Sequence, residues 1–323
     1  MTLALSVIIT SYNEGQNLER IFRDLSNQDF DKNLYEILFL EAGQDSKGVV
    51  LNALQGTSKL LKYWHLPKYS RTAALNYLVK QSKANLVVRL DARTHIDQSY
   101  LSKIYDLSVR EQVANVGGVQ VPIGDSKMQK MVAFIMSHKF GLGGGKSRNQ
   151  DYKGKVDSIY LGAFNRKYMP QEPWFDEELP KISEDSDLNF RIRQMGGSVI
   201  LDSRIIVWHY PRENLKSFFK LCFNYGFGRA LFFLKHKKFS ASRQVVLPAL
   251  FLIAVLLFVL ALFSYMALFL LLIGLSSYTL VILITSFKAI QGKLRERIIM
   301  IIGFIGCHLS WTLGFYCGLI KRQ

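Results

Sequence analysis

The sequence predicts an α/β protein in which a mostly parallel, Rossmann-like sheet with flanking helices is followed by C-terminal transmembrane helices. In the first third of the chain, short β-branched or aromatic runs alternate with segments of helical period, which is the pattern of a parallel sheet with crossover helices. Near the C-terminus, residues 245–287 and 298–320 contain no charged side chain and are 43 and 23 residues long. With 323 residues, 49% of them hydrophobic, the chain has ample material for a buried core, so global disorder is excluded.

Four buried strands are expected where the apolar runs of the N-terminal region fall. They are Leu5–Thr10, Tyr35–Leu40, Leu61–His65 and Leu86–Leu90. Helices are expected between and after them, because apolar residues recur there at i, i+3 and i+4 spacing. These stripes are Leu18–Leu25, Leu75–Val79 and Leu101–Leu107. Ligands bind beyond the carboxyl ends of the strands in such a sheet, so the polar segments 11–14, 41–46 and 91–95 are candidates for a binding site.

From residue 114 to 212 the pattern is less regular. The polar, glycine-rich segment Gly141–Lys155 is expected to be a loop, either one that closes over a substrate or an ordinary surface loop. Its GLGGGKS stretch falls short of a phosphate-binding P-loop, because Phe140 stands where the first glycine is required and no strand is expected before it. A regular helix is expected from Asp185 to Met195.

The chain is strongly basic, with 41 Lys and Arg against 25 Asp and Glu and a net charge of +16. Such a charge suits nucleic acid, an anionic membrane surface or an anionic small molecule. We disfavour nucleic acid because the sequence contains no nucleic-acid recognition motif. Three cysteines, Cys222, Cys307 and Cys317, are too few for a disulfide framework or a cysteine-based zinc site.

The C-terminal apolar runs predict a membrane domain over residues 245–323. The first run would form a helix of about 65 Å, twice the roughly 30 Å of a bilayer core, so we expect it to fold back on itself. The expected spans are 245–264, 267–287 and 298–320, with a bend at Ser264–Met266. A pair of buried core helices in a soluble protein is the alternative, which the length of the runs disfavours.

The segment before the first span combines aromatic and basic side chains. Leu215–Lys238 is expected to be an interfacial helix or an ordinary amphipathic helix, and its basic end at residues 235–238 favours contact with anionic headgroups. We therefore predict a soluble domain over 1–212, an interfacial helix and basic linker over 213–244, and then the membrane domain. Basic residues before the first span and between the last two place the soluble domain on the cytoplasmic side of the plasma (inner) membrane in a multi-pass protein.

Acidic and polar residues follow two of the expected strands at their carboxyl ends. Ser11, Tyr12 and Glu14 follow the first strand and Glu41 follows the second, so they offer hydrogen-bonding groups for a nucleotide base and ribose. Asp91 ends a third apolar strand at the rim of the sheet. An ordinary turn or helix-capping aspartate is the alternative interpretation of Asp91.

A further acidic cluster opens the helix expected near residue 185. Glu184, Asp185 and Asp187 lie in its first turn, where the helix dipole stabilises ionised carboxylates. A general base must be ionised at neutral pH, and this position favours that state. A capping box without a catalytic role is the alternative.

Eight short motifs in order resemble those of the family 2 glycosyltransferases, in particular bacterial exopolysaccharide enzymes of the succinoglycan-biosynthesis type. The motifs are SVIITSYNE (6–14), SRTAALN (70–76), VVRLDAR (87–93), GLGGGKSR (141–148), VDSIYLGAFNR (156–166), WFDEEL (174–179), EDSDLNFRIRQMGG (184–197) and YGFGR (225–229). Together they extend over about two-thirds of the chain. The resemblance implies a GT-A fold, a nucleotide-diphosphate sugar donor that is usually UDP-linked, and inversion at the anomeric carbon.

The resemblance also implies roles for individual residues. Glu41 falls at the uracil-binding acidic position and Arg71 near the nucleotide. Asp91 takes the first position of the Asp-x-Asp motif, and Asp185 takes the position of the catalytic base, with Glu184 and Asp187 supporting it. Arg229, in the last motif, is a further substrate-binding candidate.

The motif that usually holds a metal ion departs from the family pattern. Arg93 stands at the second Asp position and cannot coordinate a cation, so we expect it to neutralise the donor diphosphate. A divalent cation, Mg²⁺ or Mn²⁺, would then be held by Asp91, phosphate oxygens and His95 or His209.

The Gln-x-x-Arg-Trp motif of processive synthases is also missing, because Leu221 lies where the Gln is expected. We therefore predict the addition of one sugar to a lipid-linked, polyprenyl-diphosphate saccharide acceptor. A processive polysaccharide synthase and a catalytically degenerate membrane scaffold are the alternatives.

Overall fold

The computed structural model describes residues 3–54, 56–179, 182–239, 242–289 and 293–321. The chain divides into two compact units. Unit 1 comprises Met1–Ile123 and Gly145–Tyr210, and unit 2 comprises Gly124–Gly144 and Pro211–Gln323. The segment between them in the sequence, Gly124–Gly144, thus groups with the C-terminal helices and not with the sheet.

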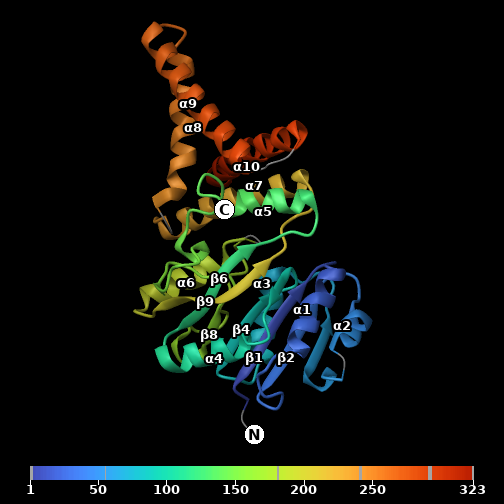
Figure 1. The fold of residues 1–323 in the computed structure, drawn as a ribbon. Coiled ribbons are helices and arrows are strands. Elements are labelled where there is room, and N and C mark those ends of the chain that lie inside the picture. The colour runs from blue at the N-terminus through green and yellow to red at the C-terminus, as the bar shows by residue number, and fades with distance from the viewer. Residues whose placement is uncertain (1–2, 55, 180–181, 240–241, 290–292, 322–323) are drawn as a thin grey trace. The chain divides into compact units, whose positions relative to one another are not determined.

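Unit 1 is built on one mixed sheet, to which nine strands contribute in the part of the chain that the structure describes (Figure 1). The strands are β1 (Leu5–Ser11), β2 (Tyr35–Glu41), β3 (Leu61–His65), β4 (Leu86–Asp91), β5 (Thr94–Ile96), β6 (Asn115–Pro122), β7 (Gly154–Lys155), β8 (Ala163–Asn165) and β9 (Val199–His209). Their order is β3-β2-β1-β4-β8-β6-β9-β5, and β7 pairs with β9. The first four strands are parallel, as the sequence predicted, and three of them extend one residue further than expected.

Two layers of helices cover the sheet because successive strand residues point to opposite faces. Val7 and Ile9 face α1 (Gln16–Ser26), α2 (Lys47–Leu54) and α4 (Tyr100–Glu111). Ile8 belongs to the core on the other face, with α3 (Arg71–Gln81) and α6 (Glu184–Gln194). The helix predicted from Asp185 therefore exists and begins one residue earlier, whereas α2 was not anticipated.

The glycine-rich segment Gly141–Lys155 contains two short ordered elements. A 3₁₀ turn, η2 (Lys146–Arg148), is followed by strand β7. Arg148 donates from Nε to Gln120 Oε1 of β6 at 3.2 Å, which holds the turn against the sheet of unit 1. Closure of this segment over a substrate stays a prediction.

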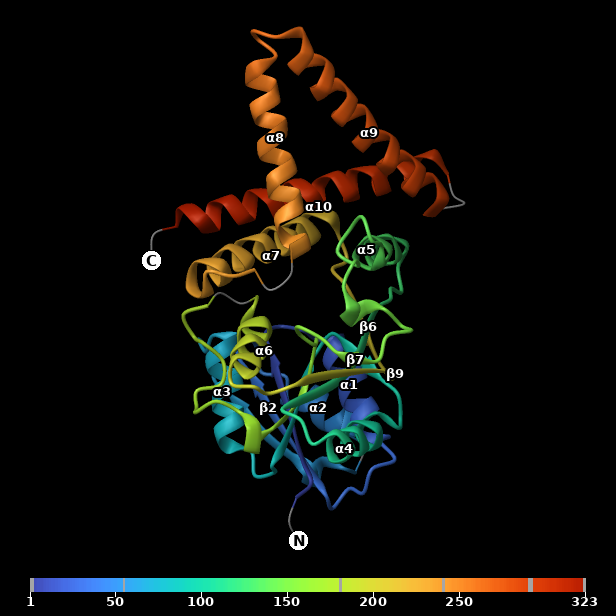
Figure 2. The ribbon, with the colours of Figure 1, turned by 90° about the vertical axis from the view of Figure 1, so that its left-hand side faces the viewer.

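Unit 2 is helical over most of its described length (Figure 2). Its helices are α5 (Lys127–Ser137), α7 (Leu215–His236), α8 (Val246–Leu260), α9 (Tyr265–Ala289) and α10 (Leu294–Ile320), with short 3₁₀ turn η4 (Ser242–Val245) before α8. The aromatic face of α7 packs on α10 around the buried side chains of Phe218, Cys222, Phe304 and Cys307. The two cysteine sulfur atoms lie 3.3 Å apart. The amphipathic helix predicted at Leu215–Lys238 is thus confirmed as a helix, and its apolar face is packed within unit 2.

Glycines allow the backbones of α7 and α10 to come into contact. A Cβ atom at Gly226 of α7 would lie 1.8 Å from the carbonyl oxygen of Trp311. A Cβ atom at Gly314 of α10 would lie 2.0 Å from the carbonyl oxygen of Phe223. No side chain fits at these distances, so small residues are required along this interface.

The three C-terminal apolar helices differ in length and burial. Helices α9 and α10 are long and apolar enough to cross a membrane, whereas α8 has 15 residues and is about 22 Å long. In an 18-residue apolar stretch of α9 only 11% is buried, against 50% in the corresponding stretch of α10. The turn between α8 and α9 lies at residues 261–264. The bend was expected at Ser264–Met266, which is slightly too late, because Tyr265 and Met266 already belong to α9. Among the described residues there are thus two candidate spans and one shorter apolar helix, where the sequence predicted three spans.

We expect Gly226→Ala to lower the free energy of unfolding by about 1–3 kcal/mol, because the new methyl group forces the α7 and α10 backbones apart. Thermal unfolding of the detergent-solubilised protein measures this loss. Gly274→Ala on α9 is the matched control, because nothing lies within 4 Å of its Cβ position and alanine favours helix. Equal stability of the two variants would contradict the close helix packing.

Candidate active site

The parallel strands bring the predicted site residues to one edge of the sheet in unit 1. Ser11 pairs in register with Glu41 on β2, and Thr10 pairs with Asp91 on β4. The side chains at the carboxyl ends of three neighbouring strands therefore converge, as the alternating pattern predicted. Exposed Tyr12 follows directly after β1.

Glu41 is fully buried and organises the two loops at this edge. Its Oε1 accepts hydrogen bonds from the backbone N–H of Asn13 at 3.3 Å and of Gly43 at 2.7 Å, and its Oε2 accepts from Ser46 Oγ at 3.0 Å. Asn13 has a positive φ of 57° and accepts a further bond from the N–H of Gln44. A carboxylate with these partners fixes the conformation of the loops that follow β1 and β2.

A network of two acids and two arginines, of which Glu184 and Arg89 are buried, lies at the centre of the site. Arg71, the first residue of α3, donates from Nη2 to Asp91 Oδ2 at 2.7 Å and lies 3.5 Å from Glu184 Oε1 through its Nε. Arg89 of β4 donates from Nη2 to Glu184 Oε1 at 2.7 Å and lies 3.7 Å from Asp91 Oδ1. The network therefore joins β4, the start of α3 and the start of α6.

The arginines decide the charge state of the two acids. Burial alone raises the pKa of Asp91 and of Glu184, but the guanidinium groups of Arg71 and Arg89 outweigh it and hold both values below the ordinary range. The two carboxylates in turn raise the pKa of Arg71 against the effect of burial. Asp91, Glu184 and Arg71 are consequently charged at neutral pH.

Arg89 was not anticipated as a site residue. Its side chain is only 3% exposed, and its guanidinium lies 5.5 Å from the ring centre of Phe175. Its Nε and Nη1 have no hydrogen-bond partner in the described part of the chain. A charged residue inside the apolar strand VVRLD is the sequence signal that points to it, because a buried charge requires a partner.

Tyr160 and His209 extend the network on the side of Asp91. The Tyr160 hydroxyl donates to Asp91 Oδ2 at 3.2 Å and lies 3.1 Å from His209 Nδ1. Since the hydroxyl has one proton, His209 must donate from Nδ1 for both contacts to be hydrogen bonds. Of the two histidines that the sequence offered as metal ligands, His209 is thus the one joined to Asp91.

The start of α6 presents its three acids in different ways. Glu184 is buried, and its Oε2 accepts from the N–H of Ser183, whose φ is 111°. Asp187 is fully buried and pairs through Oδ2 with Arg191 Nε at 2.9 Å. Asp185 is half-buried, and its Oδ1 accepts from the N–H of Ser186 at 2.7 Å. Asp185 is therefore the acid of this cluster that a substrate can reach most easily.

His95 is not brought to Asp91 by any contact in the structure. Its Nδ1 bonds to Asp24 Oδ2 of α1 at 2.8 Å, and its ring lies 5.0 Å from that of Trp208. Because β5 pairs antiparallel with β9, His95 lies opposite Trp208 in the sheet. The structure thus gives His95 a partner other than Asp91, and its expected role as a metal ligand with Asp91 stays a prediction. Within the described ranges, no three His, Cys, Asp or Glu side chains lie close enough together to hold a metal ion.

Two further predicted site residues have other surroundings. Arg93 pairs through Nε with Glu14 Oε2 at 2.8 Å, so these two candidates lie together after β4 and β1. Arg229 lies on α7 in unit 2, and its role stays a prediction.

A family model and curated relatives point to the same protein family. Residues 6–169, just over half of the chain, match the family model described as Glycosyl transferase family 2. The succinoglycan biosynthesis protein ExoA of Rhizobium meliloti (strain 1021) is 23% identical over 242 residues, which cover 74% of this chain and 73% of that protein. A dolichyl N-acetyl-α-D-glucosaminyl phosphate 3-β-D-2,3-diacetamido-2,3-dideoxy-β-D-glucuronosyltransferase of Methanococcus voltae is 24% identical over 241 residues, covering 72% of this chain and 74% of the relative.

The fold is also found among solved structures. The mannosyltransferase PcManGT from Pyrobaculum calidifontis, in complex with GDP-Man and Mn²⁺, has a TM-score of 0.68 at 16% sequence identity. The likeness covers 100% of this chain and 89% of that chain. It confirms the expected GT-A-like fold.

Proposed function

The chain belongs to glycosyl transferase family 2, and from this premise we propose that it moves a sugar, with inversion, from a nucleotide-diphosphate donor to a lipid-linked saccharide. The observation that carries the proposal is the charged network at the carboxyl edge of the sheet. Arg71 remains 33% exposed there while it pairs with Asp91. Its remaining N–H groups suit a diphosphate, which a planar guanidinium binds with two parallel hydrogen bonds.

Asp185 is the proposed general base. It accepts the proton of the acceptor hydroxyl while that oxygen bonds to the anomeric carbon, and the nucleoside diphosphate leaves with the electrons of the broken C–O bond. Glu184 and Asp187 act as positioning residues, because Glu184 fixes the start of α6 to Arg89 of β4 and Asp187 binds Arg191. Arg191 also donates to the carbonyl oxygen of Trp174, which ties α6 to the preceding segment.

The donor is proposed to lie between the loops held by Glu41 and the network around Asp91. The exposed ring of Tyr12 and the loop around Asn13 would contact the base and ribose, and buried Ser11 ends β1 directly before them. Arg93, paired with Glu14, is near enough in sequence and fold to Asp91 to share in neutralising the diphosphate. The mannosyltransferase of similar fold is named with a nucleotide sugar, which supports this class of donor.

Asp185→Asn is expected to cut the rate of sugar transfer by about 10²-fold or more and to leave the stability unchanged, because only the proton acceptor is lost. Initial rates with purified membranes, a panel of nucleotide sugars and a polyprenyl-diphosphate saccharide measure this effect. Glu184→Gln is the contrasting variant. It leaves Arg89 without its nearest carboxylate and should lower the free energy of unfolding by about 3–5 kcal/mol. Normal turnover by Asp185→Asn would remove Asp185 from the role of base.

A divalent cation is proposed to assist at Asp91, whose carboxylate suits Mg²⁺ or Mn²⁺ and would share the ion with phosphate oxygens of the donor. His209, which bonds to Tyr160 through Nδ1, could contribute only through its other ring nitrogen. The ion would offset the charge that develops on the leaving diphosphate. Arg71 and Arg93 supply permanent positive charge on the same edge of the sheet.

Removal of divalent ions with a chelator should lower the transfer rate at least about tenfold, and added Mn²⁺ or Mg²⁺ should restore it. Arg93→Asp should make the transfer rate depend more strongly on the divalent ion, because the variant replaces a positively charged side chain with a carboxylate that can bind the ion together with Asp91. If chelation leaves the rate unchanged, the arginines alone neutralise the diphosphate and the proposal of a metal ion fails.

The membrane arrangement is proposed from the helices of unit 2. The views of Figures 1 and 2 agree that α8 and α9 form a hairpin and that α10 lies across it beside α7. The large apolar side chains that α10 exposes fall on one stripe, at intervals of four and seven residues. They are Leu294, Ile298, Ile302, Leu309, Leu313 and Ile320. These features favour a membrane-inserted α8–α9 hairpin with α7 and α10 at the cytoplasmic surface of the plasma (inner) membrane, in place of the three spans that the sequence suggested.

The same proposed arrangement supports a lipid-linked acceptor. A surface-lying helix pair brings its chain to the depth of lipid headgroups, where a lipid-linked saccharide is presented. The Methanococcus relative is named for a dolichyl-linked sugar phosphate, which supports this class of acceptor.

A reporter that is active only in the periplasm, fused after Gln323, should be silent in a membrane-inserted protein, because a hairpin returns the chain to the cytoplasm. The same reporter in the turn after Phe263 should be active and serves as the control. Activity after Gln323 would show that α10 crosses the membrane and would restore the three-span arrangement.

A further inference from the structure

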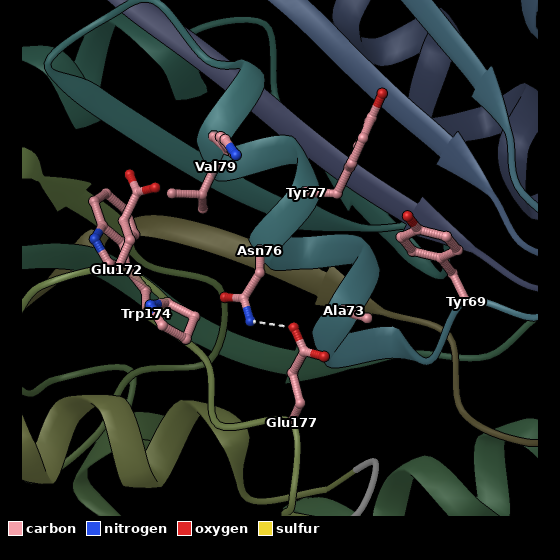
Figure 3. A pocket seen from close by; sticks show the side chains of 10 residues that line it. Tyr69, Ala73, Asn76, Tyr77, Val79, Glu172, Trp174 and Glu177 are labelled. Atoms are coloured by element: carbon pink, nitrogen blue, oxygen red, sulfur yellow. Dashed lines mark hydrogen bonds between the residues drawn. The ribbon is translucent and has the colours of Figure 1, made fainter.

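A hollow of about 550 Å³ lies in unit 1 between α3 and the segment 172–177 (Figure 3). Its floor is the outer face of α3 around Ala73 and Asn76. One wall is formed by Tyr69 and Tyr77, and the other by Glu172 and its neighbours. Small-molecule sites commonly measure about 300–1,000 Å³, so the hollow is large enough for a ligand.

The aromatic wall offers an apolar surface to a ligand. Tyr69 is 40% exposed, and its ring meets that of Tyr77 edge-on at a centroid distance of 6.0 Å. Tyr77 in turn meets Trp64 edge-on at 5.6 Å. The ring of Tyr69 is therefore held by its neighbours while much of it faces outward, and such rings bind the C–H-rich face of a ligand.

The opposite side of the hollow offers polar groups that are only partly used. Glu177 Oε1 accepts from Asn76 Nδ2 at 2.9 Å, and Glu172 Oε1 accepts from Arg166 Nη1 at 2.8 Å. Each carboxylate is thus held through one oxygen, and its other oxygen has no hydrogen-bond donor among the residues that the structure describes. Lys80, which also lines the hollow, is exposed.

The hollow is preformed because α3 and the 172–177 segment are fastened together. Asn76 Nδ2 donates to the carbonyl oxygen of Phe175 at 2.7 Å, and Asn76 Oδ1 accepts from the N–H of Phe175 at 2.9 Å. Because the walls of this pocket are already ordered, ligand binding does not carry the entropic cost of ordering them.

The same two elements lead into the proposed reaction centre. Helix α3 begins with Arg71, which pairs with Asp91, and the segment after Glu177 continues to Asp185 at the start of α6. The 172–177 segment is tied to α6 directly, because Arg191 donates to the carbonyl oxygen of Trp174. A chain molecule bound in the hollow would therefore lie on elements that also carry the reacting groups.

We propose that this hollow binds a sugar of the acceptor that lies beyond the sugar receiving the new residue. The proposal rests on the proposed glycosyltransferase function. A pyranose presents an apolar C–H face to Tyr69 and hydroxyl groups to the free carboxylate oxygens and to Lys80, whereas a lipid tail would leave these charged groups without partners. The donor is a poor fit, because Glu172 and Glu177 repel its diphosphate.

Binding of octyl glycosides that carry one, two or three hexose residues tests the proposal on the purified full-length protein. Saturation-transfer NMR and intrinsic fluorescence titration give the affinities without any turnover. Tyr69→Ala should weaken binding of the two- and three-sugar glycosides at least about tenfold, and Tyr69→Trp should restore it because an aromatic surface is retained. Binding of the one-sugar glycoside should change much less.

Glu177→Gln and Glu178→Gln form the matched pair for the polar side. Both residues are exposed and adjacent, but only Glu177 lines the hollow. Glu177→Gln should weaken binding several-fold and Glu178→Gln should not, while both variants keep the melting temperature of the wild type.

Two results separate this proposal from the proposed function. If the wild type binds no glycoside, or if Tyr69→Ala and Glu177→Gln bind as the wild type does, the hollow is not a saccharide site. If the glycosides bind as expected but no nucleotide sugar is turned over, the saccharide site stands and the proposed function fails.

Discussion

The structure depends on the buried ion pair between Arg89 and Glu184. Both side chains are at most 4% exposed, and a charge removed from water to this degree is costly unless its partner is in place. Arg89 belongs to the strand that ends at Asp91, and Glu184 precedes Asp185 at the start of α6. One contact of 2.7 Å therefore sets the position of the proposed base relative to the proposed donor site.

Arg71 is the member of this network that is accessible to a ligand. It is shared between Asp91 and Glu184, and it is far more exposed than Arg89. The proposed donor diphosphate would compete with Asp91 for the Arg71 guanidinium, whereas the contact of Arg89 with Glu184 would be kept in either case. The two arginines thus differ in role: one maintains the architecture, and the other can exchange partners without leaving a buried acid uncompensated.

The sequence predicted which strand residues lie at the carboxyl edge of the sheet, but it did not predict most of the side-chain contacts there. The four parallel strands follow from local alternation of apolar residues, and Ser11, Glu41 and Asp91 come to one edge because parallel strands share their direction. The network of Arg89, Tyr160 and His209 joins segments that are distant in the sequence, and no local period encodes such pairs. The contact of His95 with Asp24 was not predicted for the same reason, because Asp24 lies on a helix 71 residues earlier. The length of α8 was overestimated because hydropathy locates apolar runs but does not show where the turn at residues 261–264 ends a helix.

The placement of α5 has a consequence for how the protein is made. This helix lies in the sequence between β6 and the rest of the sheet, but Val132, Ile135 and Met136 are buried in a cluster with residues of α7, α9 and α10. During synthesis α5 leaves the ribosome well before any of those helices. Its apolar face therefore stays exposed to solvent until α10 has emerged. Unit 2 is therefore completed late in synthesis. A polypeptide that stopped after β9 would leave the apolar face of α5 exposed to solvent and would be prone to aggregate.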